Sequence, residues 1–251
     1  MNTSEADKVL HCAMTIGEQL LFSGAEVRRV EDTIRRICMA YGATRADVFS
    51  ITSSIVTTMF FGEFESVTQT RRISGMKNDL NRLDQLNQLS RKICAERPDP
   101  EAVLEQIAQI DAQPGYSFCA QLLIYALISG AFCAFFGGTA SDMAASAVIG
   151  VLLKCLESLI RRASVNALFT ALLCSCAGGF LAHGAVELGL GAHVDMISIG
   201  NIMLFIPGIA FTNSLRDMFS GDIITGLIRF AESILMAIIV ALGFNLAGFV
   251  L

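Results

Sequence analysis

One short stretch of the sequence, PGIAFTNSLRDMFSGD, gathers an unusual density of polar groups between two apolar runs. It offers hydroxyl groups, a side-chain amide, one guanidinium and two carboxylates. An arginine can bind a carboxylate through two parallel hydrogen bonds, and the acidic groups can balance the arginine or carry a proton. The residues of interest in this stretch are Pro207, Gly208, Thr212, Asn213, Ser214, Arg216, Asp217, Gly221 and Asp222.

The Pro207-Gly208 step predicts a kink or break in an otherwise apolar helix, because proline lacks a backbone N–H. Backbone groups freed inside a bilayer need protein, water or a substrate as partners. Broken helices beside polar groups form the binding sites of many secondary transporters. The alternative is a polar cytoplasmic loop below a proline kink, and the residues alone leave both interpretations open.

Further polar residues interrupt or border the apolar runs. Lys154 and Glu157 are three residues apart, as are Arg229 and Glu232, so each pair can neutralise itself locally. Ionisable groups in membrane spans usually face a partner or a water-filled cavity, although those near an end can also reach the interface. Lys154 lies deepest and is the better candidate for a substrate or coupling role. Asn201 is a further polar candidate, in the run that precedes Pro207.

A second motif lies near the N-terminus, where Ser-Gly-Ala-Glu precedes an Arg-Val-Glu element. The Ser and Glu of the first four residues predict a capping box at the start of a helix. The charged residues that follow form either a small-ligand site or a solvated helix face with i,i+3 and i,i+4 pairs. The candidate residues of this motif are Ser23, Gly24, Glu26, Arg29 and Glu31.

Composition divides the 251-residue chain into a polar part and an apolar part. Charged residues make up 16% of the chain, against about a quarter in ordinary soluble domains. Residues 1–117 hold 29 charged side chains and residues 118–251 hold 12. A Gln113-Pro114-Gly115 linker signal predicts a boundary there, with a cytoplasmic α/β domain at 1–115 and a membrane domain at 116–251. The net charge of −5 and the lack of a dense basic block argue against nucleic-acid binding.

Five apolar segments are long enough to cross about 30 Å of hydrocarbon. Arginines 161, 162 and 216 follow the second and fourth segments, which places those loops and the N-terminus on the cytoplasmic side. No signal peptide is evident in the first thirty residues. The sequence thus predicts a multi-pass protein of a bacterial cell (inner) membrane, in contact with lipid. The predicted spans are about 117–138, 142–160, 165–187, 195–214 and 224–251.

The N-terminal part predicts helices and a small, mostly antiparallel sheet. Strand-like segments occur at 47–51, 54–61 and 64–70, with a turn at Gly62-Glu63. The eight cysteines include no CxxC pair and none has a histidine at zinc-ligand spacing, so we expect no metal site. The sequence also lacks a P-loop, a GxSxG motif and an HExxH motif, and we therefore expect neither a cofactor nor an enzyme.

The two motifs together resemble those of the threonine/serine exporter (ThrE) family. The family pattern of Pro-Gly, Thr-Asn, Arg-Asp and Gly-Asp is matched between Pro207 and Asp222. The Ser-Gly-Ala-Glu and Arg-Val-Glu elements are matched between Ser23 and Glu31. A family Thr-Pro-Thr-Gly strand segment is replaced here by Thr52-Ser53-Ser54-Ile55, which puts any role for that strand in doubt.

This resemblance implies secondary export of small metabolites. The fused family type implies threonine and serine, and the split type implies succinate-like dicarboxylates. The length of the chain resembles the larger subunit of the split type (YjjP-like), which implies a smaller membrane subunit (YjjB-like) as partner and an oligomeric assembly. Two alternatives come from other classes: a membrane-anchored sensor or scaffold whose cytoplasmic domain binds a small ligand, and a membrane hydrolase using the N-terminal domain.

Overall fold

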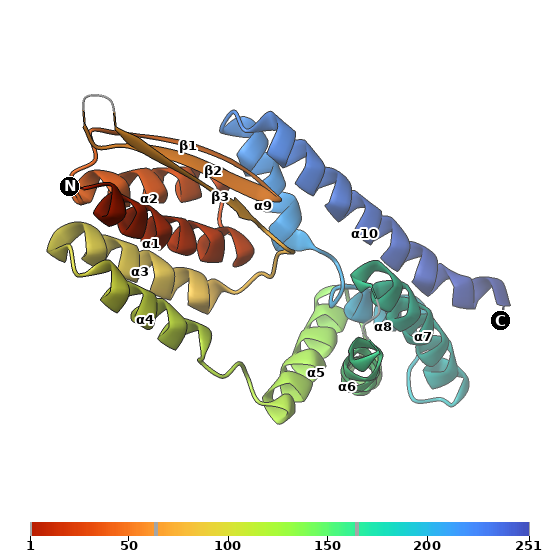
Figure 1. The fold of residues 1–251 in the computed structure, drawn as a ribbon. Helices are drawn as coiled ribbons and strands as arrows, with labels where there is room; N and C mark the ends of the chain where they lie inside the picture. The colour runs from red at the N-terminus through yellow and green to blue at the C-terminus, as the bar shows by residue number, and fades with distance from the viewer. Residues whose placement is uncertain (1, 63–64, 164–165, 251) are drawn as a thin grey trace. The chain divides into compact units, whose positions relative to one another are not determined.

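The computed structural model describes residues 2–62, 65–163 and 166–250, and the chain in it forms two compact units. Unit 1 combines residues 1–114 with residues 209–231. Unit 2 combines residues 115–208 with residues 232–251. The second segment of unit 1 therefore lies between two segments of unit 2 in the sequence, and the elements follow one another in chain order as labelled in Figure 1.

Unit 1 is built of helices and one small sheet. Its three strands pair in the order β1-β2-β3, and both pairings are antiparallel, which confirms the predicted kind of sheet. Val48 lies opposite Thr57, and Val56 lies opposite Thr70. The turn predicted at Gly62-Glu63 includes residue 63, which is outside the described residues. The elements are α1 (Thr3–Phe22), α2 (Val27–Ala40), β1 (Arg45–Ile51), β2 (Ser54–Phe60), β3 (Ser66–Arg72), α3 (Leu80–Glu96), α4 (Pro100–Asp111), α9 (Gly208–Phe219) and the first part of α10 (Ile223–Val250).

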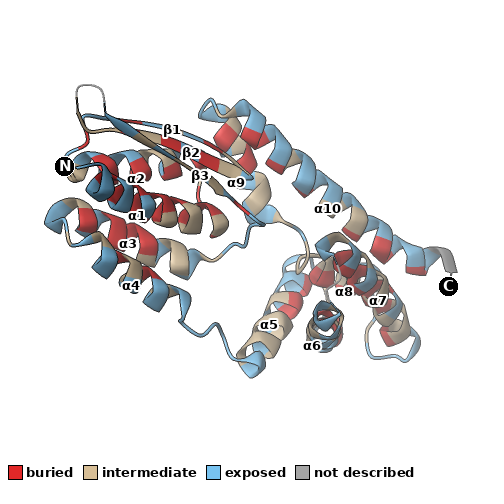
Figure 2. Ribbon diagram, viewed as in Figure 1, coloured by how far each residue is buried: buried red, intermediate tan, exposed pale blue. Residues whose placement is uncertain are grey.

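The core of unit 1 follows from helical spacing. Val27, Val30, Ile34 and Ile37 line one side of α2, and all four are completely buried. Burial of such a side chain contributes about 1.5–3 kcal/mol. Helix α1 approaches this face closely at Gly17, where an added Cβ would lie 2.4 Å from a terminal carbon of Ile34. Figure 2 shows the buried residues concentrated on the inner sides of these helices.

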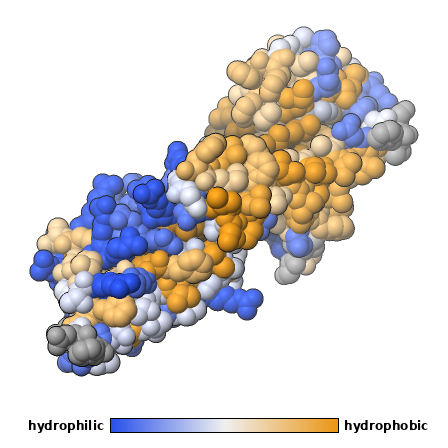
Figure 3. Space-filling view, turned by 90° about the horizontal axis from the view of Figure 1, so that it is seen from above, coloured by the Kyte–Doolittle hydropathy of each residue, from blue (hydrophilic) through white to orange (hydrophobic). Residues whose placement is uncertain are grey.

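Unit 2 holds long apolar helices whose outer faces carry large hydrophobic side chains. Leu123 and Leu127 of α5 are each 62% exposed, and Phe135 at its end is 78% exposed. An apolar surface of this kind suits contact with lipid tails, and Figure 3 shows apolar side chains gathered over this part of the molecule. The elements that lie wholly in unit 2 are α5 (Phe118–Phe135), α6 (Ala140–Arg162), α7 (Ala167–Glu187) and α8 (Val194–Ile202).

Four helices among the described residues are long and apolar enough to cross a membrane, so the prediction of five spans is wrong. They are α5, α6, α7 and residues 223–248 of α10. The predicted span at 195–214 is divided into α8, with 9 residues, and α9, with 12. At 1.5 Å per residue, neither piece covers the thickness of the hydrocarbon core. An apolar run therefore does not guarantee a continuous helix when a Pro-Gly step interrupts it.

Candidate functional site

The break predicted at Pro207-Gly208 is confirmed by the helix boundaries. Helix α8 ends at Ile202 and α9 begins at Gly208. The N–H of Gly208 donates to the carbonyl of Ile206 at 2.9 Å, which forms a tight turn at the start of α9. The polar half of the motif, from Thr212 onward, thus lies on a short helix of its own. This arrangement places it in unit 1, together with the Ser-Gly-Ala-Glu motif.

The two sequence motifs contact each other through the backbone of residues 24 and 25. Asn213 Nδ2 donates to the carbonyl of Gly24 at 3.5 Å. The guanidinium of Arg229 reaches the carbonyl of Ala25 at 3.4 Å from both terminal nitrogens. The chain turns between α1 and α2 at Gly24, which adopts a φ of 94°, in the left-handed region that favours glycine. A side chain at Gly24 would also meet Asn78 Oδ1 at 2.7 Å.

The predicted capping box at Ser23–Glu26 is wrong. Ser23 ends α1 rather than starting α2, and Glu26 is the N-cap residue of α2 with no side-chain cap bond. The Glu26 carboxylate instead forms an ion pair with Arg216 of α9. The Arg216 side chain is 60% exposed and that of Glu26 is 26% exposed, so the pair remains accessible. The hydrogen bond that Arg216 donates to the Glu26 carboxylate raises the pKa of Arg216, which keeps the guanidinium charged.

Asp217 and Arg229 form a buried ion pair beside this accessible one. Arg229 Nη1 donates to Asp217 Oδ2 at 2.8 Å, and the two side chains are 2% and 1% exposed. The backbone N–H of Val27 also donates to the Asp217 carboxylate. Burial raises the pKa of Asp217, while the Arg229 charge and the Val27 N–H act in the opposite direction. This pair joins α9, α10 and the first residue of α2, and it has little access to a solute.

The Gly221-Asp222 step forms the turn between α9 and α10. Gly221 has a φ of 99°, and the N–H of Asp222 donates to the carbonyl of Asp217 at 3.0 Å. Glu31 of the other motif accepts hydrogen bonds from Ser50 N at 2.8 Å and Ser50 Oγ at 3.2 Å. Burial raises the pKa of Glu31, and the nearby Asp222 charge raises it further. The Glu31 and Asp222 carboxylates are therefore close enough to interact electrostatically.

The other predicted residues fall outside this cluster. In unit 2, Glu157 accepts hydrogen bonds from Lys154 Nζ at 3.0 Å, Tyr125 Oη at 2.8 Å and Arg161 Nε at 2.8 Å. Lys154 is thus neutralised within its own helix, as its spacing predicts. Also in unit 2, Asn201 Nδ2 donates to Ser146 Oγ at 3.1 Å, which links α8 to α6.

Arg29 and Glu232 complete the predicted set. Arg29 lies on the exposed side of α2, facing α3. Glu232 is exposed and follows the last residue that α10 contributes to unit 1. Across the described ranges, no group of three or more His, Cys, Asp or Glu side chains is arranged to hold a metal ion.

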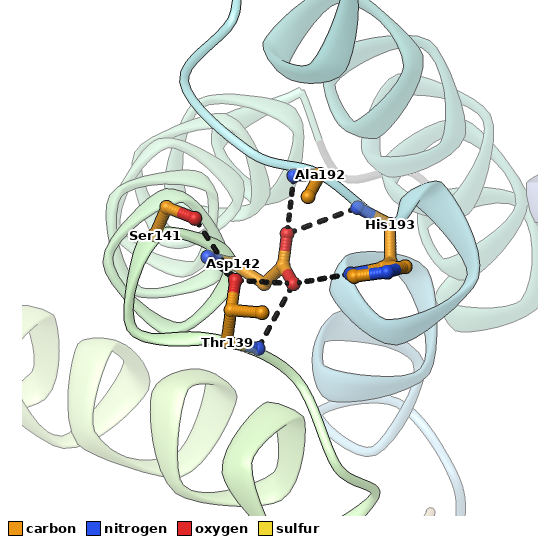
Figure 4. Close-up of polar contacts among 5 residues, drawn as sticks. All are labelled: Thr139, Ser141, Asp142, Ala192 and His193. Atoms are coloured by element: carbon orange, nitrogen blue, oxygen red, sulfur yellow. Dashed lines mark hydrogen bonds and ion pairs between the residues drawn. The ribbon is translucent and has the colours of Figure 1, made fainter.

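Sequence reasoning missed one polar cluster, around Asp142 of α6 (Figure 4). This carboxylate is completely buried and accepts five hydrogen bonds. Two come from Thr139, one from the N–H of Ala192, and two from the N–H and the ring Nδ1 of His193, at 3.0 and 2.9 Å. The Thr139-x-x-Asp142 spacing of a capping box was the available signal. The carboxylate raises the pKa of His193 and fixes the loop before α8 to the start of α6.

Four apolar helices with exposed hydrophobic faces define a multi-pass membrane protein. The family model described as "Putative threonine/serine exporter" matches residues 11–251, so the chain belongs to the ThrE family. It is 24% identical over 243 residues to the "Threonine/serine exporter" of Corynebacterium glutamicum, an alignment that covers 92% of this chain. The same alignment covers 49% of that relative, so the chain spans about half its length. No solved structure matches.

Proposed function

We propose that the chain is part of a membrane exporter of threonine and serine, and that Arg216 and Glu26 bind the transported amino acid. The observation that carries this proposal is the contact between the two family motifs, which places an accessible guanidinium beside an accessible carboxylate. Family membership supports export over the sensor and hydrolase interpretations.

The chemistry of the Arg216–Glu26 pair suits a zwitterion. An amino acid carries one carboxylate and one ammonium group, so it can replace the ion pair by binding Arg216 with the first and Glu26 with the second. Such an exchange leaves no charge without a partner, which limits the cost of opening the pair. The side chain of Asn213 lies on the same helix and can hydrogen-bond the hydroxyl of threonine or serine.

A succinate-like dicarboxylate fits this pair less well. Its second carboxylate would meet Glu26, and like charges at close range repel. A matched test follows from this difference. Glu26→Gln is expected to weaken threonine efflux, since it removes the partner of the ammonium group, but to leave or improve succinate efflux.

The buried Asp217–Arg229 pair has a different role in this proposal. It holds α9 against α10 and so positions Arg216, while Thr212, Pro207 and Gly208 set where α9 begins. In unit 2, Lys154, Glu157 and Asn201 are candidates for the path through the membrane, because polar groups in spans usually face a water-filled route or a partner.

A second membrane half is also part of the proposal. The relative from Corynebacterium glutamicum is about twice as long as the region aligned, and transporter paths commonly lie between two repeats. We propose that a smaller membrane subunit supplies that half, that the complex is oligomeric and that it lies in a bacterial inner membrane with the N-terminal residues 1–115 in the cytoplasm. Purified chain reconstituted alone in liposomes is expected to show no threonine efflux, and robust efflux without a partner would contradict the two-half arrangement.

The substrate site is tested by threonine efflux from cells that express the chain with its membrane partner. Arg216→Lys is expected to reduce efflux about tenfold or more, because lysine cannot reproduce the planar fork that binds a carboxylate. Arg45→Lys is the matched control, since Arg45 forms an exposed ion pair with Asp47 at 2.7 Å elsewhere in unit 1. Near-normal efflux by a correctly inserted Arg216→Lys protein would contradict the assigned role.

A further inference from the structure

A cavity of about 330 Å³ lies between α2 and α3 in unit 1. Its lining residues occur at the same spacing on both helices, at positions i, i+3, i+4 and i+7, which places them on one face of each helix. Helix faces that pack together are normally apolar at these positions, whereas these two are polar. The lining residues are Arg29, Asp32, Thr33 and Arg36 of α2, and Asn87, Ser90, Arg91 and Cys94 of α3.

The rim of the cavity carries surplus positive charge. Arg36 Nε forms an ion pair with Asp32 at 2.8 Å. Arg29 and Arg91 form no ion pair within the part of the chain that the structure describes. Two guanidinium groups from different helices are therefore available, and together they match a ligand with two negative charges.

The floor of the cavity offers hydrogen-bond acceptors. Thr33, Asn87 and Ser90 are at most 9% exposed. The hydroxyl donors of Thr33 and Ser90 are already used, because Thr33 Oγ1 donates to Arg29 O and Ser90 Oγ donates to Asn87 O, each at 2.8 Å. Asn87 Nδ2 uses one of its two N–H groups to donate to Leu83 O at 2.7 Å. The remaining lone pairs of these oxygens can accept hydrogen bonds from ligand hydroxyl groups.

We propose that this cavity binds a small phosphate monoester that carries hydroxyl groups. Arg29 and Arg91 hold the phosphate dianion, since a guanidinium matches phosphate geometry through paired hydrogen bonds. The floor accepts hydrogen bonds from the hydroxyl groups, which a simple dicarboxylate cannot donate. The volume lies at the lower end of the range for small-molecule sites, about 300–1,000 Å³. This site is separate from the Arg216–Glu26 pair and goes beyond export.

The position of the cavity suggests how a ligand can act on the rest of unit 1. Arg29 lies one turn after Glu26 on the same helix. A ligand that bridges Arg29 and Arg91 stabilises the first two turns of α2 against α3, and these turns directly follow Glu26, whose carboxylate pairs with Arg216. The phosphate monoester is therefore placed to regulate the substrate site.

Isothermal titration calorimetry on the detergent-solubilised full chain tests the binding site directly and needs no transport activity. The probes are glycerol 3-phosphate, inorganic phosphate and succinate. We expect saturable binding that weakens in that order. Arg91→Gln is expected to weaken glycerol 3-phosphate binding about tenfold or more, because it removes a charge-assisted hydrogen-bond pair. Arg28→Gln, an exposed change on α2 outside the cavity lining, alters net charge equally and is expected to bind as the unmodified chain does.

Several outcomes overturn the proposal. These are no saturable heat with glycerol 3-phosphate at millimolar concentrations, equal affinity of the unmodified chain and Arg91→Gln, or an equal loss in Arg28→Gln. Tighter binding of succinate than of glycerol 3-phosphate overturns the ligand class. If Arg91→Gln does not fold, Arg29→Gln provides the same comparison on the other helix. Because binding is measured without transport, failure here is distinguishable from failure of the export proposal.

Discussion

Removal of the Asp217 charge is the sharpest test of how the motif cluster is held together. Asp217→Asn preserves the size of the side chain but leaves the buried guanidinium of Arg229 without its carboxylate. Removing one partner of a buried ion pair costs about 3–5 kcal/mol, because the remaining charge stays out of water. Both side chains are at least 98% buried, so we expect the full effect.

This cost translates into a measurable thermal shift. A protein of this size loses about 2–4 °C of melting temperature per kcal/mol, which gives a decrease of about 6–20 °C. The measurement is thermal unfolding of the full chain in detergent, followed by circular dichroism. Asp47→Asn is the matched control, since the Arg45–Asp47 pair is exposed and such pairs contribute about 0–1 kcal/mol.

A double variant distinguishes ionic from steric effects. Asp217→Leu combined with Arg229→Met removes both charges, and buried ion pairs replaced by apolar residues are often neutral or stabilising. We therefore expect the double variant to melt closer to the unmodified chain than Asp217→Asn does. A decrease for Asp217→Asn no larger than that for Asp47→Asn would refute the reasoning.

Two further predictions concern unit 2. Asp142 raises the pKa of His193 above its ordinary 6.5, so the stabilisation from the protonated ring is complete below pH 6.5 and is lost as pH rises through the folded-state pKa. NMR titration of the imidazole signals measures the pKa of His193. Asp142→Asn is expected to return this pKa towards 6.5. An unchanged pKa in the variant would contradict the hydrogen bond between Asp142 and His193. Gly200→Ala places a Cβ 2.6 Å from the carbonyl of Ser129 and is expected to cost about 1–3 kcal/mol. Gly184→Ala meets nothing within 4 Å and is expected to be neutral or slightly stabilising in the same unfolding assay.

The sequence predicted structural features correctly where the interactions that form them join residues close together in the chain. The Pro207-Gly208 step located the helix break because it acts on its own backbone. The spacing of Lys154 and Glu157 predicted their ion pair because three residues make less than one helical turn. The antiparallel sheet followed from short β-branched segments close in sequence.

The candidate site could not be assembled from the sequence alone because its contacts are not local. Arg216 and Glu26 are 190 residues apart, and no spacing rule links them. Arg229 pairs with Asp217, twelve residues earlier and on another helix. The capping prediction at Ser23 failed for a related reason, since the Glu26 carboxylate has a charged partner on α9 that competes with a backbone N–H. The prediction of a fifth span was wrong because hydropathy counts apolar residues and does not show whether their helix is continuous.

The interleaving of the two units has a consequence for how the protein is made. A ribosome releases residues 1–114 first, then the helices α5 to α8, and only afterwards residues 209–231. During that interval the carbonyls of Gly24 and Ala25 and the carboxylate of Glu26 have been synthesised, but Asn213, Arg216 and Arg229 have not. The contacts between the two segments of unit 1 can therefore form only after most of the apolar helices have been synthesised. The proposed substrate site is therefore completed late in synthesis, after helices α5 to α8.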